Sequence, residues 1–340
     1  MTILDSAAGA EGRATHDAQT AATPFIGHSE AMQAVARTIR KIATDDAPVL
    51  ITGETGTGKE LAARQIHHAS RRADGPFVSI NCGALSPQTL PTELFGHERS
   101  AFAGTPGRAG RIEAANGGTL LLEEIDALPA AQQAGLLRFL EEGTIERIGG
   151  LESVAVDVRV IAATQGDLAR SVQDGAFRED LFYRLNVLQL ALPPLRERGD
   201  DIVTLAEHYL QQFRTEQNPR VEGFSEAAKR VMNAYAWPGN IRELINRVRR
   251  AVVMCETRLI TPADLGLERR TEPRDHVPTL AEVRAQAEVR AIYAAIRRNR
   301  GNIAAAARQL EISRVTLYQL MGKYGLEKDR CLESNPVWKN

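Results

Sequence analysis

Eight residues at 53–60, GETGTGKE, have the types and spacing needed to hold a chain of phosphates. They fit the pattern G-x-x-x-x-G-K and lie between an apolar run at 48–52 and a helix-like run. In this context backbone N–H groups and the positive end of the helix surround an anion, and Lys59 reaches the outer phosphates. The alternative is a glycine-rich turn without a ligand, and the strand-loop-helix context favours the phosphate loop. The residues predicted to bind nucleotide here are Gly53, Glu54, Thr55, Gly56, Thr57, Gly58, Lys59 and Glu60.

Two acidic residues end a second apolar run, GGTLLLEEID at 117–126. Phosphate hydrolysis needs one carboxylate for the shell of a Mg²⁺ ion and another to polarise the attacking water. Glu123 is predicted to hold the metal through water, and Glu124 is predicted to act on the attacking water. Glu60 stands where a phosphate loop usually has a hydroxyl ligand for Mg²⁺. Alone, two acids would indicate a solvated strand end; after a phosphate loop they indicate catalysis.

The rest of the chain predicts the elements that would position these residues. Short β-rich runs alternate with helix-like stretches, which indicates an α/β domain with a parallel sheet and helices on both faces. The strands stop after LPPLRERGDD, and 200–267 is predicted to contain helices only. The predicted strands are 48–52, 77–81, 119–124, 158–164 and 187–192, and the predicted helices between them include 31–43, 59–71 and 130–142.

Changes in composition divide the chain into segments. Residues 1–23 are rich in Ala, Thr, Gly and Asp and predict a disordered tail. The stretch ERRTEPRDHVP is charged, contains two prolines and predicts a linker. The predicted boundaries are 1–23 for the tail, 24–198 for the α/β subdomain, 199–267 for a helical lid, 268–278 for the linker, 279–327 for an all-α helix-turn-helix domain and 328–340 for a second tail.

The overall composition is that of a globular protein without a membrane segment. Hydrophobic residues make up 43% of the 340 residues and charged residues 25%, and the net charge is −1. Any affinity for nucleic acid must therefore be local. Cys82, Cys255 and Cys331 show no metal-ligand spacing, which fits a reducing compartment. No apolar run approaches the roughly 20 residues that a membrane helix needs, and no signal peptide is recognised, so a cytoplasmic protein without membrane contact is predicted.

Residues 301–326, GNIAAAARQLEISRVTLYQLMGKYGL, read as helix, turn and helix. Gly301 and Asn302 are predicted to open the first helix, and Ser313 is predicted to cap the second. Between 297 and 326 there are six basic residues and one acidic residue, a local positive charge that favours DNA over the alternative of a solvated helical hairpin. The predicted DNA contacts are Arg314, Val315, Thr316, Tyr318, Gln319 and Lys323.

A helix at 280–297 carries Ala285, Val289, Ile292 and Ile296 on one face. This face is predicted to form a dimer seam, which would imply an upstream DNA site with two-fold symmetry.

The stretch GHERSAFAGTPGRAG contains a single large apolar residue, Phe102. Its glycines and proline predict a mobile loop rather than a strand. A phenylalanine on such a loop is either tucked into the surface, the usual case for a single apolar residue, or offered to a partner.

Taken together, these motifs resemble the AAA+ ATPases that activate sigma-54 RNA polymerase, the bacterial enhancer-binding proteins. The resemblance covers about 25–326 and includes FIGHS, FVSINCGAL, ELFGHERSAFAGT, LLRFLEEGTIERIGG, VRVIAAT, FREDLFYRLNVLQLALPPLRER and WPGNIREL, besides the phosphate loop and the acidic pair. It implies an ATPase with ATP and Mg²⁺ as cofactors, a lid and a Fis-type helix-turn-helix.

The resemblance also assigns roles at matching positions. Asn81 would hold Glu124 in check until the γ-phosphate is sensed, Gln165 would be the first sensor and Arg242 the second. Arg178 and Arg184 match the arginine fingers, which brace the phosphate of a neighbouring subunit and so imply a hexameric ring. Without the resemblance, these arginines would read as surface ion pairs. Ile26 and Gly27 in FIGHS join the nucleotide-binding set.

In WPGNIREL, Asn240 and Glu243 predict an N-cap and its capping-box partner at the start of a helix.

Three departures from the family pattern bear on activity. The resemblance implies that the family hexapeptide Gly-Ala-Phe-Thr-Gly-Ala contacts sigma-54. Here Ala101, Phe102 and Gly104 match, whereas Ser100, Ala103 and Thr105 do not, and Ala103 has lost the threonine hydroxyl. Glu123 replaces the usual aspartate and Gln165 the usual asparagine, so two side chains are longer by a methylene and hydrolysis is expected to be slower. The predicted sigma-factor loop is Phe102, Ala103 and Gly104.

Two functions follow as hypotheses. The first is a transcription activator that binds upstream DNA and uses ATP to remodel sigma-54 polymerase. The second is a DNA-binding regulator with nucleotide-controlled assembly that does not engage sigma-54. A third idea, control by a signalling nucleotide, has no residue in its support. Because about 23 residues precede the ATPase, too few for a folded sensor, the signal is expected to come from a separate regulatory protein, from expression level or from a small molecule.

Overall fold

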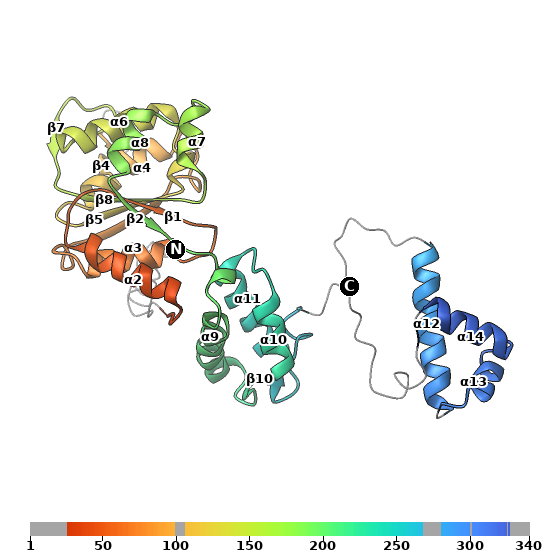
Figure 1. Ribbon diagram of the computed structural model, residues 1–340. Coiled ribbons are helices and arrows are strands. Elements are labelled where there is room, and N and C mark those ends of the chain that lie inside the picture. Colours follow the sequence, from red (N-terminus) through yellow and green to blue (C-terminus); the bar gives the residue numbers. More distant parts are fainter. Residues whose placement is uncertain (1–25, 99–105, 268–279, 300, 325, 327–340) are drawn as a thin grey trace, which may run out of the picture. The chain divides into compact units, whose positions relative to one another are not determined.

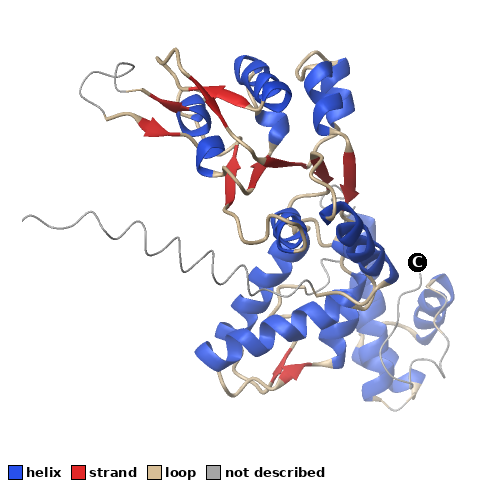
Figure 2. Cartoon of the chain, turned by 90° about the vertical axis from the view of Figure 1, so that its left-hand side faces the viewer, coloured by secondary structure: helices blue, strands red, loops and turns tan. Residues whose placement is uncertain are grey.

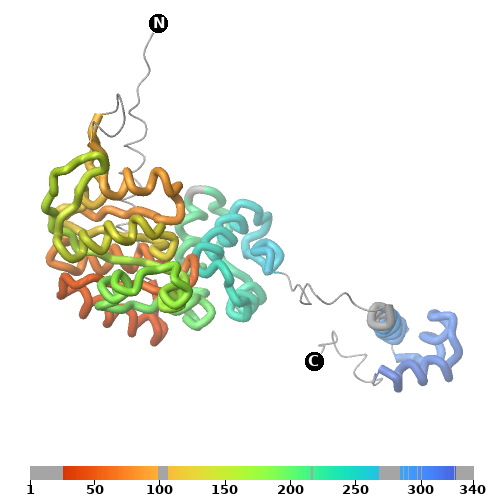
Figure 3. The backbone as a smooth tube through the Cα atoms, turned by 90° about the horizontal axis from the view of Figure 1, so that it is seen from above, coloured from red at the N-terminus to blue at the C-terminus, as the bar shows by residue number. Residues whose placement is uncertain are grey.

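The computed structural model describes residues 26–98, 106–267, 280–299, 301–324 and 326 of the chain. It divides into two units, the first ending at Glu268 and the second beginning at Arg269. The second unit is the blue helical part of the tube in Figure 3. Each unit has its own hydrophobic core and is described by itself.

A five-stranded parallel sheet forms the centre of the first unit. The strand order is β2-β5-β8-β1-β9. Figure 1 shows α2 and α3 on one face of this sheet and α6 and α8 on the other. The predicted α/β architecture is therefore confirmed. The strands are β1 (Val49–Thr52), β2 (Phe77–Asn81), β5 (Thr119–Glu123), β8 (Arg159–Thr164) and β9 (Leu188–Ala191).

Shorter elements complete this α/β part. Two antiparallel strand pairs, β3–β4 and β6–β7, extend from it. The remaining elements are α2 (Glu30–Ala43), α3 (Lys59–His68), α4 (Leu90–Phe95), β3 (Gly96–His97), β4 (Arg108–Ala109), α5 (Arg111–Ala114), the 3₁₀ turn η1 (Ile125–Ala127), α6 (Ala130–Glu142), β6 (Thr144–Glu146), β7 (Ser153–Ala155), α7 (Leu168–Gln173), α8 (Glu179–Leu185) and the 3₁₀ turn η2 (Leu195–Glu197).

The apolar run of β5 is continuous because both faces of the strand are covered. Leu121 packs in the cluster that contains the buried residues of α2 and α3. Leu120 and Leu122 point to the opposite face and pack in the cluster that contains Leu136 of α6 and Leu181 of α8. Parallel strands buried on both faces have this uninterrupted apolar pattern.

The helix predicted at 59–71 is shorter in the structure and ends at His68. The hydroxyl of Ser70 donates to the carbonyl oxygen of His67 over 2.7 Å and accepts from the backbone N–H of Arg72 over 3.1 Å. This local bonding competes with another helical turn and sends the chain toward β2.

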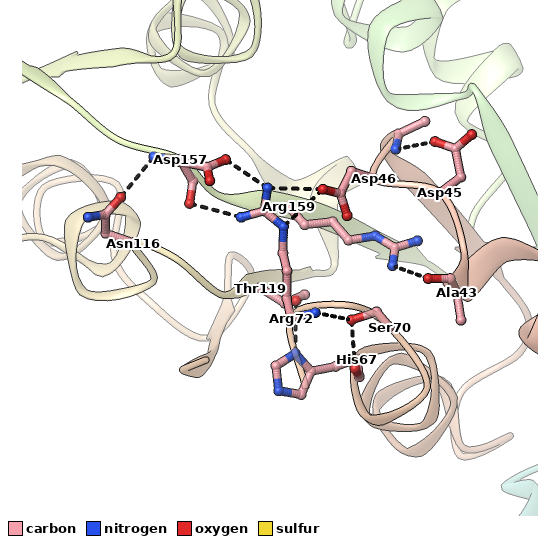
Figure 4. A network of polar contacts seen from close by, with 11 residues as sticks. Ala43, Asp45, Asp46, His67, Ser70, Arg72, Asn116, Thr119, Asp157 and Arg159 are labelled. Carbon is pink, nitrogen blue, oxygen red and sulfur yellow. Dashed lines mark hydrogen bonds and ion pairs between the residues drawn. The ribbon is translucent and has the colours of Figure 1, made fainter. Parts of the chain in front are cut away.

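Polar contacts join the amino ends of three strands (Figure 4). Arg72 precedes β2, and its guanidinium donates to Asp46, before β1, over 3.1 Å and to Asp157, before β8, over 2.7 Å. Arg159 is buried in β8 and donates to the carbonyl oxygen of Ile42 over 2.8 Å. Figure 4 shows its second contact, to the carbonyl oxygen of Ala43 over 3.4 Å. Hydrogen bonds to Asp157 and Asp46 raise the pKa of Arg72, whereas burial lowers the pKa of Arg159. The network fixes the strand ends that lie opposite the edge where Glu123 and Asn81 emerge.

A helical lid follows the sheet in the first unit. Its helices are α9 (Asp201–Gln217), α10 (Glu226–Ala234) and α11 (Asn240–Met254). The prediction of helices only was wrong, because β10 (Gly223–Phe224) pairs in parallel with β11 (Leu259–Ile260), the strand pair among the lid helices in Figure 2. Two-residue strands are too short to leave an alternating pattern in a sequence. Trp237 is fully buried in the lid core, and its indole N–H donates to the carbonyl oxygen of Met232 over 2.8 Å.

The second unit contains α12 (Leu280–Arg298), α13 (Ile303–Gln309) and α14 (Arg314–Lys323) among its described residues. As predicted, Asn302 and Ser313 cap α13 and α14, and each side chain accepts a backbone N–H three residues on.

The predicted dimer seam on α12 needs a correction. Ile292 and Ile296 are 2% and 0% exposed, because they pack with Ala306, Leu317 and Met321 inside this unit. They fill the core of the helix-turn-helix and are not available to a second copy.

Among the described helices of the chain, none combines the length and apolar character that crossing a bilayer requires.

Candidate functional site

A cavity of about 490 Å³ opens between the carboxyl edge of the sheet and the lid. The structure brings together most of the residues predicted to bind or hydrolyse a nucleotide, although they come from distant parts of the chain. The predicted residues that line it are Ile26, Thr55, Gly56, Thr57, Gly58, Lys59, Glu60, Asn81, Glu123, Glu124, Gln165 and Arg242.

The phosphate loop follows β1 and leads into the amino end of α3. Gly56 and Gly58 have φ values of +78° and +98°, which only glycine adopts at little cost. The ammonium group of Lys59 donates to the carbonyl oxygens of Gly53 over 2.6 Å and Glu54 over 3.0 Å. Burial, followed by the nearby charge of Arg242, lowers the pKa of Lys59. A cation held in this way inside a loop of N–H groups is suited to an anionic phosphate chain.

The acidic pair lies where β5 ends. Asn81, the last residue of β2, donates from Nδ2 to Oε1 of Glu124 over 3.3 Å. The Oδ1 atom of Asn81 accepts the N–H groups of Gly83 over 2.8 Å and Ala84 over 3.0 Å, so the amide is oriented by the turn after β2. A Cβ atom on Gly83 would lie 2.2 Å from Oε2 of Glu124. The sequence at 81–84 therefore makes room for the Glu124 carboxylate and gives it a donor.

Glu123 lies deeper in the site. Its pKa is raised by burial first, and then by the charges of Glu60 and Glu124. Three crowded carboxylates favour a cation between them. The described residues contain no group of three or more His, Cys, Asp or Glu side chains arranged to ligate a metal directly. Carboxylate oxygens are ligands that Mg²⁺ takes together with several waters, so the chemistry of Glu123 and Glu124 fits this ion.

Gln165 follows β8 and accepts a hydrogen bond at Oε1 from the hydroxyl of Thr55. This contact places the predicted first sensor on the phosphate loop. Arg242, in the first turn of α11, is exposed and lines the same cavity from the lid side.

Arg178 and Arg184 are not part of this cavity. Arg178 pairs with Asp180 over 2.6 Å on the surface of α8. Arg184 is exposed and donates to the carbonyl oxygen of Leu140 over 3.0 Å. Tyr183 between them is 66% exposed, so α8 and its N-cap Arg178 present two arginines and a ring to solvent.

Sequence reasoning missed the apolar end of the cavity and one buried cation. Arg198 is 2% exposed and donates to the carbonyl oxygens of Thr57 over 2.9 Å and Pro193 over 2.8 Å. Burial lowers the pKa of Arg198 to about 10. The run LPPLRERGDD, with several charges directly after a predicted strand, was the available signal. The apolar lining comes from both sides of the cavity and suits the flat base of a nucleotide. It consists of Met32, Leu61, Leu205, Tyr209, Ile241 and Ile245.

The predicted N-cap at Asn240 was wrong. The N-cap of α11 is Gly239, and Glu243 reaches back to accept the N–H of Gly239 over 3.0 Å, one residue before its predicted partner Asn240. The side chain of Asn240 is instead used between the lid and the α/β part, where it bonds to the backbone of Leu195 and Thr55.

The candidate DNA-binding face lies on α14. Arg314, Val315, Thr316, Tyr318, Gln319 and Lys323 are all exposed, and the intervening Leu317 is buried in the unit's core. The ammonium group of Lys323 lies 4.7 Å from the ring centre of Tyr324, and the contact raises the pKa of Lys323. The helix therefore presents a polar and positively charged surface with two exposed apolar side chains, Val315 and Tyr318.

The predicted sigma-factor loop, Phe102, Ala103 and Gly104, lies outside the described residues. Of its surroundings the structure describes β3 and β4. Two ion pairs stabilise the region next to β3 and β4. Arg147 donates to Glu98, which follows β3, over 2.9 Å and to Glu113 of α5 over 2.7 Å.

Three family descriptions match the chain in sequence order. Residues 25–191 match the Sigma-54 interaction domain, 196–281 the AAA+ ATPase lid domain, and 283–324 the Bacterial regulatory protein, Fis family.

Known proteins resemble the chain over most of its length. The Regulatory protein AtoC of Escherichia coli (strain K12) is 46% identical over 314 residues, which cover 89% of this chain and 68% of AtoC. The Alginate biosynthesis transcriptional regulatory protein AlgB of Pseudomonas aeruginosa is 44% identical, over 88% of this chain and 67% of AlgB. The crystal structure of NtrX from Brucella abortus in complex with ATP has a TM-score of 0.70 and 33% identity, over 93% of this chain and 72% of that one.

Proposed function

This chain belongs to the sigma-54-dependent transcriptional regulators, with an AAA+ ATPase domain, its lid and a Fis-type DNA-binding domain. We propose that it hydrolyses ATP in a ring of subunits, and that it does so to remodel sigma-54 RNA polymerase at DNA that it binds itself. The observation that carries the proposal is the single cavity in which the phosphate loop, the acidic pair and Arg242 meet.

Within that cavity the residues divide the work of phosphoryl transfer. Lys59 and the loop N–H groups bind the phosphates, and Glu123 would hold Mg²⁺. Glu124 polarises the attacking water once it is released from Asn81, whose hydrogen bond restrains it. Mg²⁺ supplies charge neutralisation on the phosphate oxygens when it is bound.

The arginine fingers act on the neighbouring subunit. Arg178 and Arg184 lie on the exposed side of α8 and away from their own cavity. A planar guanidinium braces the charge of a transferred phosphoryl group, and a head-to-tail contact that supplies it closes into a ring. Self-association from dimer to hexamer is therefore part of the proposal.

The DNA partner is contacted by the exposed side chains of α14. Arg314 and Gln319 can each form paired hydrogen bonds with a base edge in the major groove. Val315 offers a methyl surface to thymine, and Lys323 a charge to the phosphates.

The chain is proposed to act in the cytoplasm, and a separate regulatory protein or a small molecule is proposed as its signal.

A second function rests on one specific residue, Ala103. A methyl group cannot replace the hydrogen bond of the family's threonine hydroxyl, and an unmatched polar group costs about 1–3 kcal/mol. The alternative is thus a DNA-binding regulator that keeps nucleotide-controlled assembly and does not engage sigma-54.

An open-complex assay separates the two functions. A sigma-54 promoter that carries the protein's own site is incubated with polymerase, ATP and Mg²⁺, and promoter opening and phosphate release are followed together. The first function predicts that the native chain opens the promoter. The second predicts DNA binding and ATP hydrolysis without opening, and opening by the variant Ala103→Thr.

A further inference from the structure

Glu54 belongs to the phosphate loop, but its carboxylate is turned away from the cavity and toward the lid. It accepts three N–H groups: Arg196 donates to Oε1 over 2.7 Å and to Oε2 over 2.9 Å, and Asn240 donates to Oε2 over 3.1 Å. The pKa of Glu54 falls to about 2, first because of Arg196 and then because of Asn240. Arg196 belongs to η2, the segment that connects β9 with the lid. A residue of the phosphate loop is therefore bonded both to the connection that leads into the lid and, through Asn240 at the start of α11, to the lid itself.

Asn240 completes the connection from the lid side. Its side chain accepts the N–H of Leu195 over 2.7 Å and donates to the carbonyl oxygen of Thr55 over 3.0 Å as well as to Glu54. The residue is fully buried and has φ of +48°, a left-handed conformation that costs a non-glycine residue about 1 kcal/mol or more. The surroundings hold this conformation because it aims the amide at two separate chain segments, the phosphate loop at Glu54 and Thr55 and the lid connection at Leu195.

The backbone makes the same contact even closer. The N–H of Ile241 donates to the carbonyl oxygen of Gly56 over 2.9 Å. A Cβ atom on Gly56 would lie 2.4 Å from the carbonyl oxygen of Gly239. The phosphate loop thus touches the start of α11 so closely that there is no room for a side chain at position 56.

The residues that follow Asn240 in this turn are Ile241 and Arg242, which both line the nucleotide cavity. We propose that Glu54, Arg196 and Asn240 form a latch between the phosphate loop and the lid that positions Arg242 over the bound nucleotide. They are positioning residues, because none of the three lines the cavity. The inference rests on the proposed function in one respect, namely that the nucleotide binds in this cavity.

The latch has a measurable consequence for affinity. Without it the lid samples orientations in which Arg242 does not reach the nucleotide. Apparent affinity falls in proportion to the fraction of molecules that are competent to bind. Glutamine at position 54 accepts through one oxygen only, and its NH₂ group faces donors from Arg196 and Asn240. The expected loss for a triphosphate analogue is about 10-fold, the effect of a competent fraction near one tenth.

The test measures binding of a non-hydrolysable ATP analogue and of ADP, with Mg²⁺, to the full-length chain and its variants. Glu54→Gln is expected to weaken the analogue about 10-fold and ADP by less, because ADP lacks the γ-phosphate. Arg196→Lys keeps the charge but loses the paired bonds, and an intermediate loss is expected. In an Arg242→Ala background Glu54→Gln should add little, since the latch acts through Arg242.

The matched control is Glu222→Gln, which removes another exposed ion pair of the first unit, to Arg258 over 3.2 Å. It should leave both affinities unchanged. Thermal unfolding of the two glutamine variants is compared, so that a loss of affinity can be separated from a loss of stability. Unchanged affinity in Glu54→Gln, or a full additional loss on top of Arg242→Ala, would overturn the latch. A native chain that binds neither nucleotide would overturn the proposed function as well.

Discussion

Glu124 has a backbone φ of 51° at the point where β5 ends. Few residues other than glycine adopt this left-handed conformation, and such strain is concentrated at functional sites. Here it turns the carboxylate out of the strand direction and toward Asn81. The sequence predicted the acid and its partner, but the backbone conformation that brings them together was not readable from the residue type.

The change Glu124→Gln tests this residue directly. The amide cannot polarise the attacking water, so ATP hydrolysis is expected to fall about 10²–10⁴-fold, the usual contribution of a general base. Nucleotide binding should remain, because the phosphate loop is intact. Phosphate release and analogue binding are measured side by side. The control is Glu141→Gln on the exposed surface of α6; equal loss of hydrolysis in both variants would contradict the assignment.

The ionisation of Glu54 gives a second prediction. Its pKa is lowered from 4.5 to about 2 in the folded chain by Arg196 and Asn240. A carboxyl whose pKa is lowered by folding stabilises the folded state at pH values above its pKa in the unfolded state. This stabilisation disappears as the pH falls toward its pKa in the folded state. The difference between the native chain and Glu54→Gln in nucleotide affinity should therefore be constant from pH 8 to about pH 6. Titrations at both pH values check this, and a ratio that changes severalfold would contradict it.

At the scale of elements, the strands could be predicted because each is an apolar run bounded by polar residues or turns. Where elements end was harder to predict, as the early end of α3 shows, since it depends on the hydroxyl of Ser70. The short pair β10–β11 left no signal. Asn240 was predicted as a cap because asparagine favours that position. Its tertiary contacts, which a local pattern does not contain, decided otherwise.

The prediction at the scale of elements concerns Arg72, which joins the amino ends of β1, β2 and β8 (Figure 4). Its side chain is 15% exposed, whereas Asp46 and Asp157 are 52% and 78% exposed, so solvent screens the pairs. The variant Arg72→Met is expected to lower the free energy of unfolding of the first unit by about 1–2 kcal/mol, through the lost charged hydrogen bonds. Chemical denaturation measures it. Arg138→Met also breaks two pairs, with Glu142 and Glu146, and should cost less because the Arg138 side chain is 52% exposed.

At the scale of the whole molecule, the ATPase unit and the DNA-binding unit have separate cores. The division was predictable from the charged, proline-containing stretch between them. The seam on α12 was not correctly predicted, because periodicity shows that a helix face is apolar but not which partner covers it. Ile292 and Ile296 are covered by their own unit.

Complementation between subunits tests the ring. Arg184→Ala retains Glu124 in its own cavity, and Glu124→Gln retains the finger that it offers to a neighbour. Each variant alone should be nearly inactive. Mixed, they should recover a fraction of the native ATPase rate, because some interfaces then combine an intact cavity with an intact finger. The rate is measured as the mixing ratio varies. If mixing restores nothing, the arginine does not act on a neighbour.

The buried amide of Asn240 also limits the order in which the chain can fold. Its partners lie 45, 185 and 186 positions away in the sequence, at Leu195, Thr55 and Glu54. An unpaired amide is costly to bury, so this contact forms only when the sheet and the lid are already in place. Loop closure makes contacts this distant in sequence slow to form. We therefore expect the nucleotide cavity to be completed late in folding, after the hydrophobic cores of the sheet and the lid.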